Sequence, residues 1–95
     1  MKSHDDAVIT MLREDPDMAI DYLRTAFDEL DEEGGETTLL MALRHVVKAQ
    51  GGMAVVAERA KLSRESLYRA LSPKGNPTLR TMTAVIKATG LHFMT

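Results

Sequence analysis

Residues 52–71 constrain the fold of this chain more than any other stretch, because they predict two short helices joined by a tight turn. The run is GMAVVAERAKLSRESLYRAL. Its apolar residues recur at helical spacing, on the faces that two crossing helices would bury against each other. These residues are Val56, Ala57, Ala60, Leu62, Leu67, Ala70 and Leu71. The stretch therefore predicts a helix-turn-helix over about residues 53–71.

The turn of such a motif has to reverse the chain within about three residues, which a left-handed glycine usually allows. Lys61 occupies that position here, and a non-glycine residue in left-handed backbone costs about 1 kcal/mol. Ser63 stands where an N-cap belongs, and its hydroxyl is expected to accept a hydrogen bond from the Ser66 amide. Ala57 is small where the helices approach most closely, and Leu62 is expected to anchor the turn in the core.

The second helix of the motif is expected to present a polar face to a partner. Leu67 and Leu71 are four residues apart and point inward. The outward residues are Arg64, Glu65, Ser66, Tyr68 and Arg69. These side chains suit a DNA major groove, where arginine pairs with guanine, glutamate with cytosine and serine with either base type. Arg69 lies farther along and is predicted to contact phosphate, whereas Tyr68 either completes the core or touches the DNA backbone. A solvated surface is the alternative for both arginines.

The loop that follows, SPKGNP at residues 72–77, is dense in turn-forming residues. Its polar groups are expected to line one phosphate strand beside the groove, positioning the protein without specifying sequence. The predicted contacts are Lys74, the amides of Gly75 and Asn76, the Thr78 hydroxyl and Arg80. An ordinary connection between two helices is the alternative.

Periodic apolar residues predict four further helices, over about residues 5–14, 16–32, 37–50 and 78–90. In the last of these, the residues expected to face the core are Leu79, Met82, Val85, Ile86 and Ala88. Asp15 is expected to cap the second of these, with Pro16 in its first turn. Gly34 and Gly35 break the pattern and are the expected hinge. Residues 91–95, LHFMT, alternate enough for a short strand. The fold class is therefore all-α, with a possible C-terminal strand.

Charge divides the chain into two regions. Residues 1–35 carry three bases and eleven acids, a net charge of −8, and residues 36–95 carry nine bases and three acids, a net charge of +6. The first region is predicted to be an acidic N-terminal helical arm and the second a helix-turn-helix DNA-binding domain. A basic region fits nucleic acid, and the acidic arm fits a cationic partner, with a solvated acidic face as the alternative.

Composition argues against an enzyme. The three histidines are His4, His45 and His92, and neither they nor any nucleophile falls at catalytic or metal-ligand spacing. We expect no catalytic residue, cofactor or metal, and we expect His45 at a partly exposed rim of the core. Cysteine is absent. With neither an apolar leader nor a membrane-spanning stretch, the expected location is the cytoplasm.

Residues 62–93, LSRESLYRALSPKGNPTLRTMTAVIKATGLHF, resemble the C-terminal part of the addiction-module antidote proteins. These are small antitoxins with a Cro/C1-type, lambda repressor-like helix-turn-helix. The most specific signal is Ser-Arg-Glu-Ser-Leu-Tyr followed by Leu-Ser-Pro-x-Gly-Asn-Pro, and residues 42–60 and the acidic arm are also similar to the family. The chain departs from the pattern at two places. Lys61 stands where the turn usually has a glycine, and Gly52 and Met53 stand where many relatives of the broader fold carry a DNA-contacting glutamine.

The resemblance implies a repressor-like core of about five helices, a homodimer, and binding to the double-stranded operator DNA of the chain's own toxin–antitoxin operon. It also implies a cognate toxin, a small basic ribonuclease of the RelE/ParE type. Two other functions stay open: a stand-alone helix-turn-helix regulator without a toxin, and a protein-interaction module on the same fold. The dimer surface is expected either in the last helix and the tail at residues 91–95 or in the arm.

Overall fold

The computed structural model describes residues 3–91, and within that range it contains six helices and no strand. The helices are α1 (His4–Glu14), α2 (Pro16–Asp28), α3 (Gly35–Ala49), α4 (Gly52–Ala60), α5 (Arg64–Ala70) and α6 (Leu79–Ala88). The all-α prediction is confirmed for this part of the chain. Of the expected C-terminal strand, Leu91 belongs to no strand, and residues 92–95 lie outside the described range. None of the described helices is long and apolar enough to cross a membrane.

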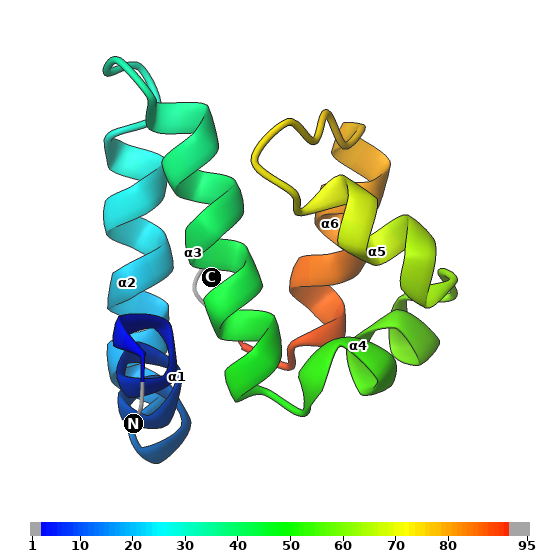
Figure 1. The fold of residues 1–95 in the computed structure, drawn as a ribbon, viewed down its shortest axis with the longest axis horizontal. Helices are drawn as coiled ribbons and strands as arrows, with labels where there is room; N and C mark the ends of the chain where they lie inside the picture. The colour runs from blue at the N-terminus through cyan, green and yellow to red at the C-terminus, as the bar shows by residue number, and fades with distance from the viewer. Residues whose placement is uncertain (1–2, 92–95) are drawn as a thin grey trace.

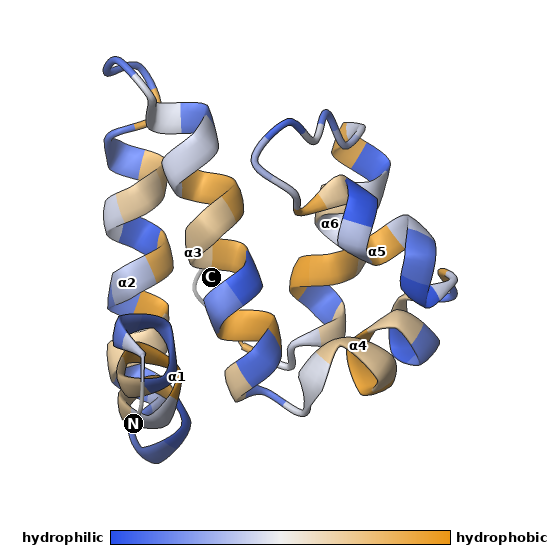
Figure 2. Cartoon of the chain, viewed as in Figure 1, coloured by the Kyte–Doolittle hydropathy of each residue, from blue (hydrophilic) through white to orange (hydrophobic). Residues whose placement is uncertain are grey.

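Helix α3 lies at the centre of the molecule, with α1 and α2 on one side and α4, α5 and α6 on the other (Figure 1). Its apolar residues are buried along nearly its whole length, among them Leu43, Val46 and Val47. It packs against α1 and α2 and meets α4, which in turn packs against both α5 and α6. Figure 2 shows apolar residues along α3 and on the side of α2 that faces it. The acidic arm therefore shares its core with α3.

Side-chain caps mark the start of four helices, α1, α2, α5 and α6. Asp15 accepts hydrogen bonds from the amides of Asp17 and Met18, and Pro16 is the first residue of α2, as the sequence predicted. Thr78 caps α6 by accepting from the amide of Thr81. Each of these oxygens satisfies an amide that the first turn of a helix leaves without an intrahelical partner.

Helix α2 ends at Asp28, four residues before the expected end at Glu32. Five of the six residues from 28 to 33 are acidic, and Leu30 alone interrupts the run. Negative charge at a helix C-terminus opposes the helix dipole, so this run disfavours continuing the helix. The chain instead folds into turns that run to Gly34, which has a φ of +75°.

The connection between α2 and α3 is closely packed. A Cβ at Gly35 would lie 2.5 Å from the carbonyl oxygens of Glu29 and Leu30, so only glycine fits there. Helix α3 begins at this glycine and packs against both α1 and α2. The domain boundary expected at residue 35 stays a prediction.

Candidate nucleic-acid interface

The helix-turn-helix is formed by α4, the turn at residues 61–63, and α5. Lys61 has φ 60° and ψ 40°, which makes it the one non-glycine residue with a positive φ among residues 3–91. The Leu62 amide donates to the Ala57 carbonyl at 2.9 Å and closes the end of α4. Leu62 is half-buried against the core. The left-handed turn predicted at Lys61 is confirmed.

Ser63 begins the second helix of the motif. Its hydroxyl oxygen accepts from the Ser66 amide at 3.0 Å, as predicted, and its hydroxyl donates to Ser66 Oγ at 2.8 Å. The Ser66 hydroxyl, expected to contact a base, is therefore already bonded to Ser63. Leu67 and Leu71 are buried, as the four-residue spacing required. These contacts fix the rotation of α5 about its axis.

That rotation leaves the opposite face of α5 open to solvent. Arg64, Glu65 and Arg69 are exposed, and Ser66 is half-buried. Tyr68 keeps 47% of its surface exposed, so its ring does not complete the core. Of the two roles expected for Tyr68, contact with a partner is the one that its position allows.

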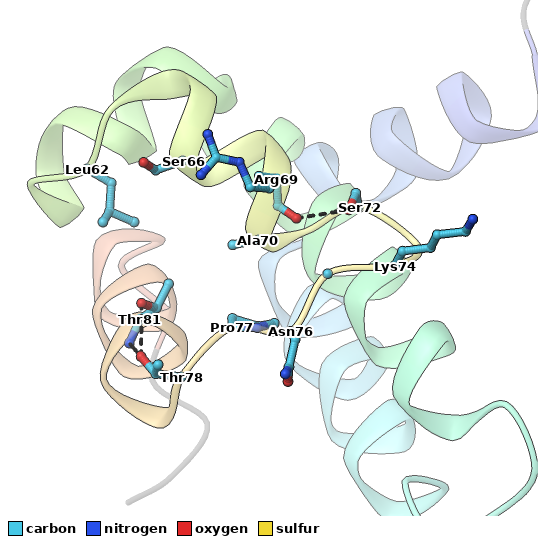
Figure 3. Close-up of a pocket in the computed structure, with 11 residues that line it drawn as sticks. Leu62, Ser66, Arg69, Ala70, Ser72, Lys74, Asn76, Pro77, Thr78 and Thr81 are labelled. Atoms are coloured by element: carbon cyan, nitrogen blue, oxygen red, sulfur yellow. Dashed lines mark hydrogen bonds between the residues drawn. The ribbon is translucent and has the colours of Figure 1, made fainter.

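A groove of about 640 Å³ runs between α5, the loop after it and the start of α6 (Figure 3). Five of the ten predicted site residues line it, namely Ser66, Arg69, Lys74, Asn76 and Thr78. The other five lie outside the groove lining, namely Ser63, Arg64, Glu65, Tyr68 and Arg80. The structure thus brings the expected phosphate contacts of the loop together with Arg69, while Arg64 and Glu65 stand on the free face of α5.

Gly75 holds the loop against the end of α5. A Cβ at this position would lie 2.2 Å from the carbonyl oxygen of Ala70, so the close approach requires glycine. The Gly75 amide donates to the Ser72 carbonyl at 2.8 Å, and the Ser72 hydroxyl donates to the Arg69 carbonyl at 2.9 Å. These contacts fix the backbone of the loop that carries Lys74 and Asn76.

Sequence reasoning overlooked Thr81 as a groove residue. The Thr78 hydroxyl donates to Thr81 Oγ at 3.1 Å, and both threonines line the groove. The signal was available, because a hydroxyl residue three positions after a helix cap lies beside that cap. Ser72 was also overlooked: it lines the groove, and its hydroxyl donates to the Arg69 carbonyl.

Part of the positive charge of residues 36–95 is used inside the molecule. Arg44 donates from Nη1 to the Leu71 carbonyl at 3.1 Å, and Arg59 donates from Nη1 to the Ala88 carbonyl at 3.5 Å. Both carbonyls lie at helix ends, where no intrahelical donor is available. The charges left for a partner near the groove belong to exposed side chains, namely Lys61, Arg64, Arg69, Lys74 and Arg80.

His45 is not at a partly exposed rim, and that expectation was wrong. Only 3% of its surface is exposed. Tyr22 on α2 and Asp5 on α1 cover it and hydrogen-bond to its two ring nitrogens. These two helices come from the arm, whose position against α3 the sequence did not reveal.

The comparison with known families covers almost the whole chain. Residues 4–95 match a family model described as a probable addiction module antidote protein. The chain belongs to this family. An uncharacterized protein of Haemophilus influenzae is 41% identical to this antidote-family chain over 66 residues, covering 70% of this chain and 67% of the relative. No solved structure matches the chain.

The antidote-family match includes α1 and α2 as well as the helix-turn-helix. The family model therefore covers the two helices of the arm. An antidote in general implies a cognate toxin as its partner.

Proposed function

We propose that this antidote-family chain neutralises a basic RelE/ParE-type toxin by direct binding and, as a homodimer, represses its own operon. The helix-turn-helix would be of the Cro/C1, lambda repressor-like type. The protein would act in the cytoplasm by binding its partners, without catalysis, metal or cofactor. The observation that carries the DNA-binding part is the exposed polar face of α5, which adjoins a groove that already gathers Arg69, Lys74 and Thr78.

In this proposal α5 enters the major groove and the loop follows the phosphates. Arg64 and Glu65 stand in the first turn of α5, the part of a recognition helix that contacts base edges. Arg69, Lys74 and Arg80 supply charge for the phosphate strand beside it. One seven-residue helix buries little DNA surface, so specificity requires two copies on a palindromic site.

A gel-shift titration with the DNA upstream of the chain's own gene tests the interface. The variant R64A/R69A should weaken binding by about tenfold or more, because a good bidentate base contact contributes about 1–3 kcal/mol. The matched control K2A/K87A removes the same amount of charge outside the predicted site and should bind nearly as tightly as wild type. Equal binding by R64A/R69A and wild type would remove the proposed recognition surface.

Salt dependence separates this proposal from a protein-interaction module on the same fold. Phosphate contacts release counterions, so affinity for DNA should fall steeply between low and moderate salt. An interaction module would show weak DNA binding at every salt concentration and no preference for the upstream sequence. A stand-alone regulator would bind DNA in the same way, and only the neighbouring gene distinguishes it from an antidote.

Toxin neutralisation is tested on the full chain, because α1 and α2 share their core with α3. The variant D17N/D21N/D28N removes three exposed charges from α2 and leaves the Asp15 cap and the Asp5 contact to His45 intact. Co-expressed with the toxin from the adjacent gene, it should protect cells less well than wild type, since the attraction for a cationic toxin is reduced.

The two sets of substitutions serve as controls for each other. R64A/R69A should still protect cells from the toxin, and D17N/D21N/D28N should still bind the upstream DNA. Full protection by the α2 variant would show that the acidic face of the arm is merely solvated.

A further inference from the structure

Leu79 is an unusual residue at the start of α6. It follows the Thr78 cap, and 83% of its surface is exposed, more than for any other large hydrophobic residue in the part of the chain described. The next most exposed, Met11, has 51% of its surface in water. An isolated leucine on a surface is ordinary, but this one lies between Pro77 and Met82 in the sequence, and both of those residues line an apolar hollow.

The hollow measures about 190 Å³ and lies between α3, the loop after α5, and α6. Its apolar lining comes from Leu30, Leu39, Leu40, Pro77 and Met82, and the exposed carboxylate of Glu36 also borders it. Leu79 and Met82 are three residues apart on α6 and so share one flank of that helix. The exposed leucine and the hollow therefore face the same side of the molecule.

We propose that this flank is the homodimer surface, in which Leu79 of each copy enters the hollow of the other. A two-fold axis produces such an exchange directly, because in an isologous contact residue i meets residue j and residue j meets residue i. The size is suitable, since an apolar cavity of about 150 Å³ already accepts a benzene-sized group.

Charge complementarity favours a second copy as the occupant. Arg80 follows Leu79 and is exposed, and Glu36 borders the hollow that Leu79 would enter. The exchange thus brings each guanidinium near the carboxylate of the partner copy. The acidic Glu36 would equally oppose an anionic occupant such as DNA.

The surface also adjoins the proposed DNA groove. Gly75, Asn76 and Pro77 line both the groove and the hollow. A contact here would hold the two α5 helices at a fixed separation, as binding to two half-sites requires. The choice of a second copy as partner rests on the proposed function, but the oligomeric state is measured without DNA. Loss of DNA binding with this dimer intact would therefore contradict only the proposed function.

Sedimentation equilibrium of the full chain provides the first test. Wild type should be a dimer, and Leu79→Asp should raise the dissociation constant roughly a hundredfold, because two buried leucines are lost at once. Met11→Asp is the matched control, an equal change at another exposed apolar residue, and should dimerise like wild type. A monomeric wild type, a dimeric Leu79→Asp, or equal weakening by both variants would overturn the proposal.

Cross-linking gives a second test that does not depend on how Leu79→Asp folds. The chain has no cysteine, so Leu79→Cys and Glu36→Cys can be prepared as separate, isotopically distinct proteins and mixed under oxidising conditions. The expected product is a disulfide that joins position 79 of one copy to position 36 of the other. A mixture that yields only links between identical positions, or no link, would overturn the exchange.

Discussion

The hydroxyl of Tyr22 lies 2.8 Å from Nδ1 of His45 and joins α2 to the buried side of α3. Nε2 of the same ring lies 3.1 Å from Oδ1 of Asp5 on α1. An ionised carboxylate only accepts, so Nε2 carries the proton and donates to Asp5, and in the neutral ring Nδ1 accepts from Tyr22. Three helices therefore meet at one buried imidazole whose two nitrogens are both satisfied.

Tyr22→Phe should destabilise the fold by about 1–3 kcal/mol, because it leaves the buried Nδ1 of His45 without a donor. Urea denaturation of the full chain measures the change. Tyr68→Phe is the matched control: Tyr68 is exposed, and removing its hydroxyl should alter stability by less than about 0.5 kcal/mol. Equal effects of the two substitutions would show that the contact with His45 contributes nothing.

The same tyrosine predicts a loss of stability at alkaline pH. Burial raises the pKa of Tyr22 above its ordinary value of 10.0, and the negative charge of Asp5 raises it further. The folded state thus holds the phenolic proton more tightly than the unfolded state. The resulting stabilisation is complete below pH 10 and is lost as pH rises through the folded pKa. Unfolding free energies measured from pH 8 to 11 should fall more steeply for wild type than for Tyr22→Phe.

The sequence predicted what depends on near neighbours in the chain. The Ser63 and Asp15 caps, the left-handed Lys61 and the inward Leu67 all follow from residues within one or two turns, and the structure has each of them. His45 shows where this reasoning fails. Periodicity placed it on α3, but its burial comes from α1 and α2, through Asp5 and Tyr22, which are forty and twenty-three positions away in sequence.

The hollow beside Leu79 depends on distant residues in the same way. Its walls come from the turn after α2, from α3, from the loop after α5 and from α6. In the sequence, Leu79 is simply the first apolar residue of a helical stripe and was expected to face the core. Only the packing of α6 against α4 shows that Val85 faces inward and Leu79 outward.

Arg44 should couple the stability of α3 to that of α5. Its guanidinium donates to the Leu71 carbonyl at the end of α5, and a hydrogen bond from a charged group contributes about 1.5–3 kcal/mol. Arg44→Met keeps the aliphatic part of the side chain, so its expected cost of about 1.5 kcal/mol reports the lost hydrogen bond. Hydrogen exchange should show faster exchange of the α5 amides. Arg64→Met, an exposed arginine, is the control and should leave both measurements nearly unchanged.

Lys61→Gly should stabilise the helix-turn-helix by about 1 kcal/mol, since it removes the side chain that disfavours left-handed backbone. Lys61→Ala separates this effect from the loss of charge, because alanine keeps the unfavourable Cβ. In thermal and urea unfolding, Lys61→Gly should be more stable than wild type, and Lys61→Ala should have nearly the stability of wild type. If the alanine variant gains as much stability as the glycine variant, the gain comes from removing the lysine charge and not from the backbone.

Gly75→Ala should be among the most damaging small changes in the loop. The added Cβ would meet the Ala70 carbonyl at 2.2 Å, so the loop has to move away from the end of α5, at a cost of about 1–3 kcal/mol by analogy with overpacked sites. Gly34→Ala is the control for an added methyl group. Gly34 has open space but a φ of +75°, so its substitution should cost only the backbone strain, about 1 kcal/mol.

The two variants should differ further in DNA affinity, because Lys74 and Asn76 move with Gly75 and not with Gly34. A Gly75→Ala variant that binds the upstream DNA as tightly as Gly34→Ala would show that the position of the loop does not matter for recognition.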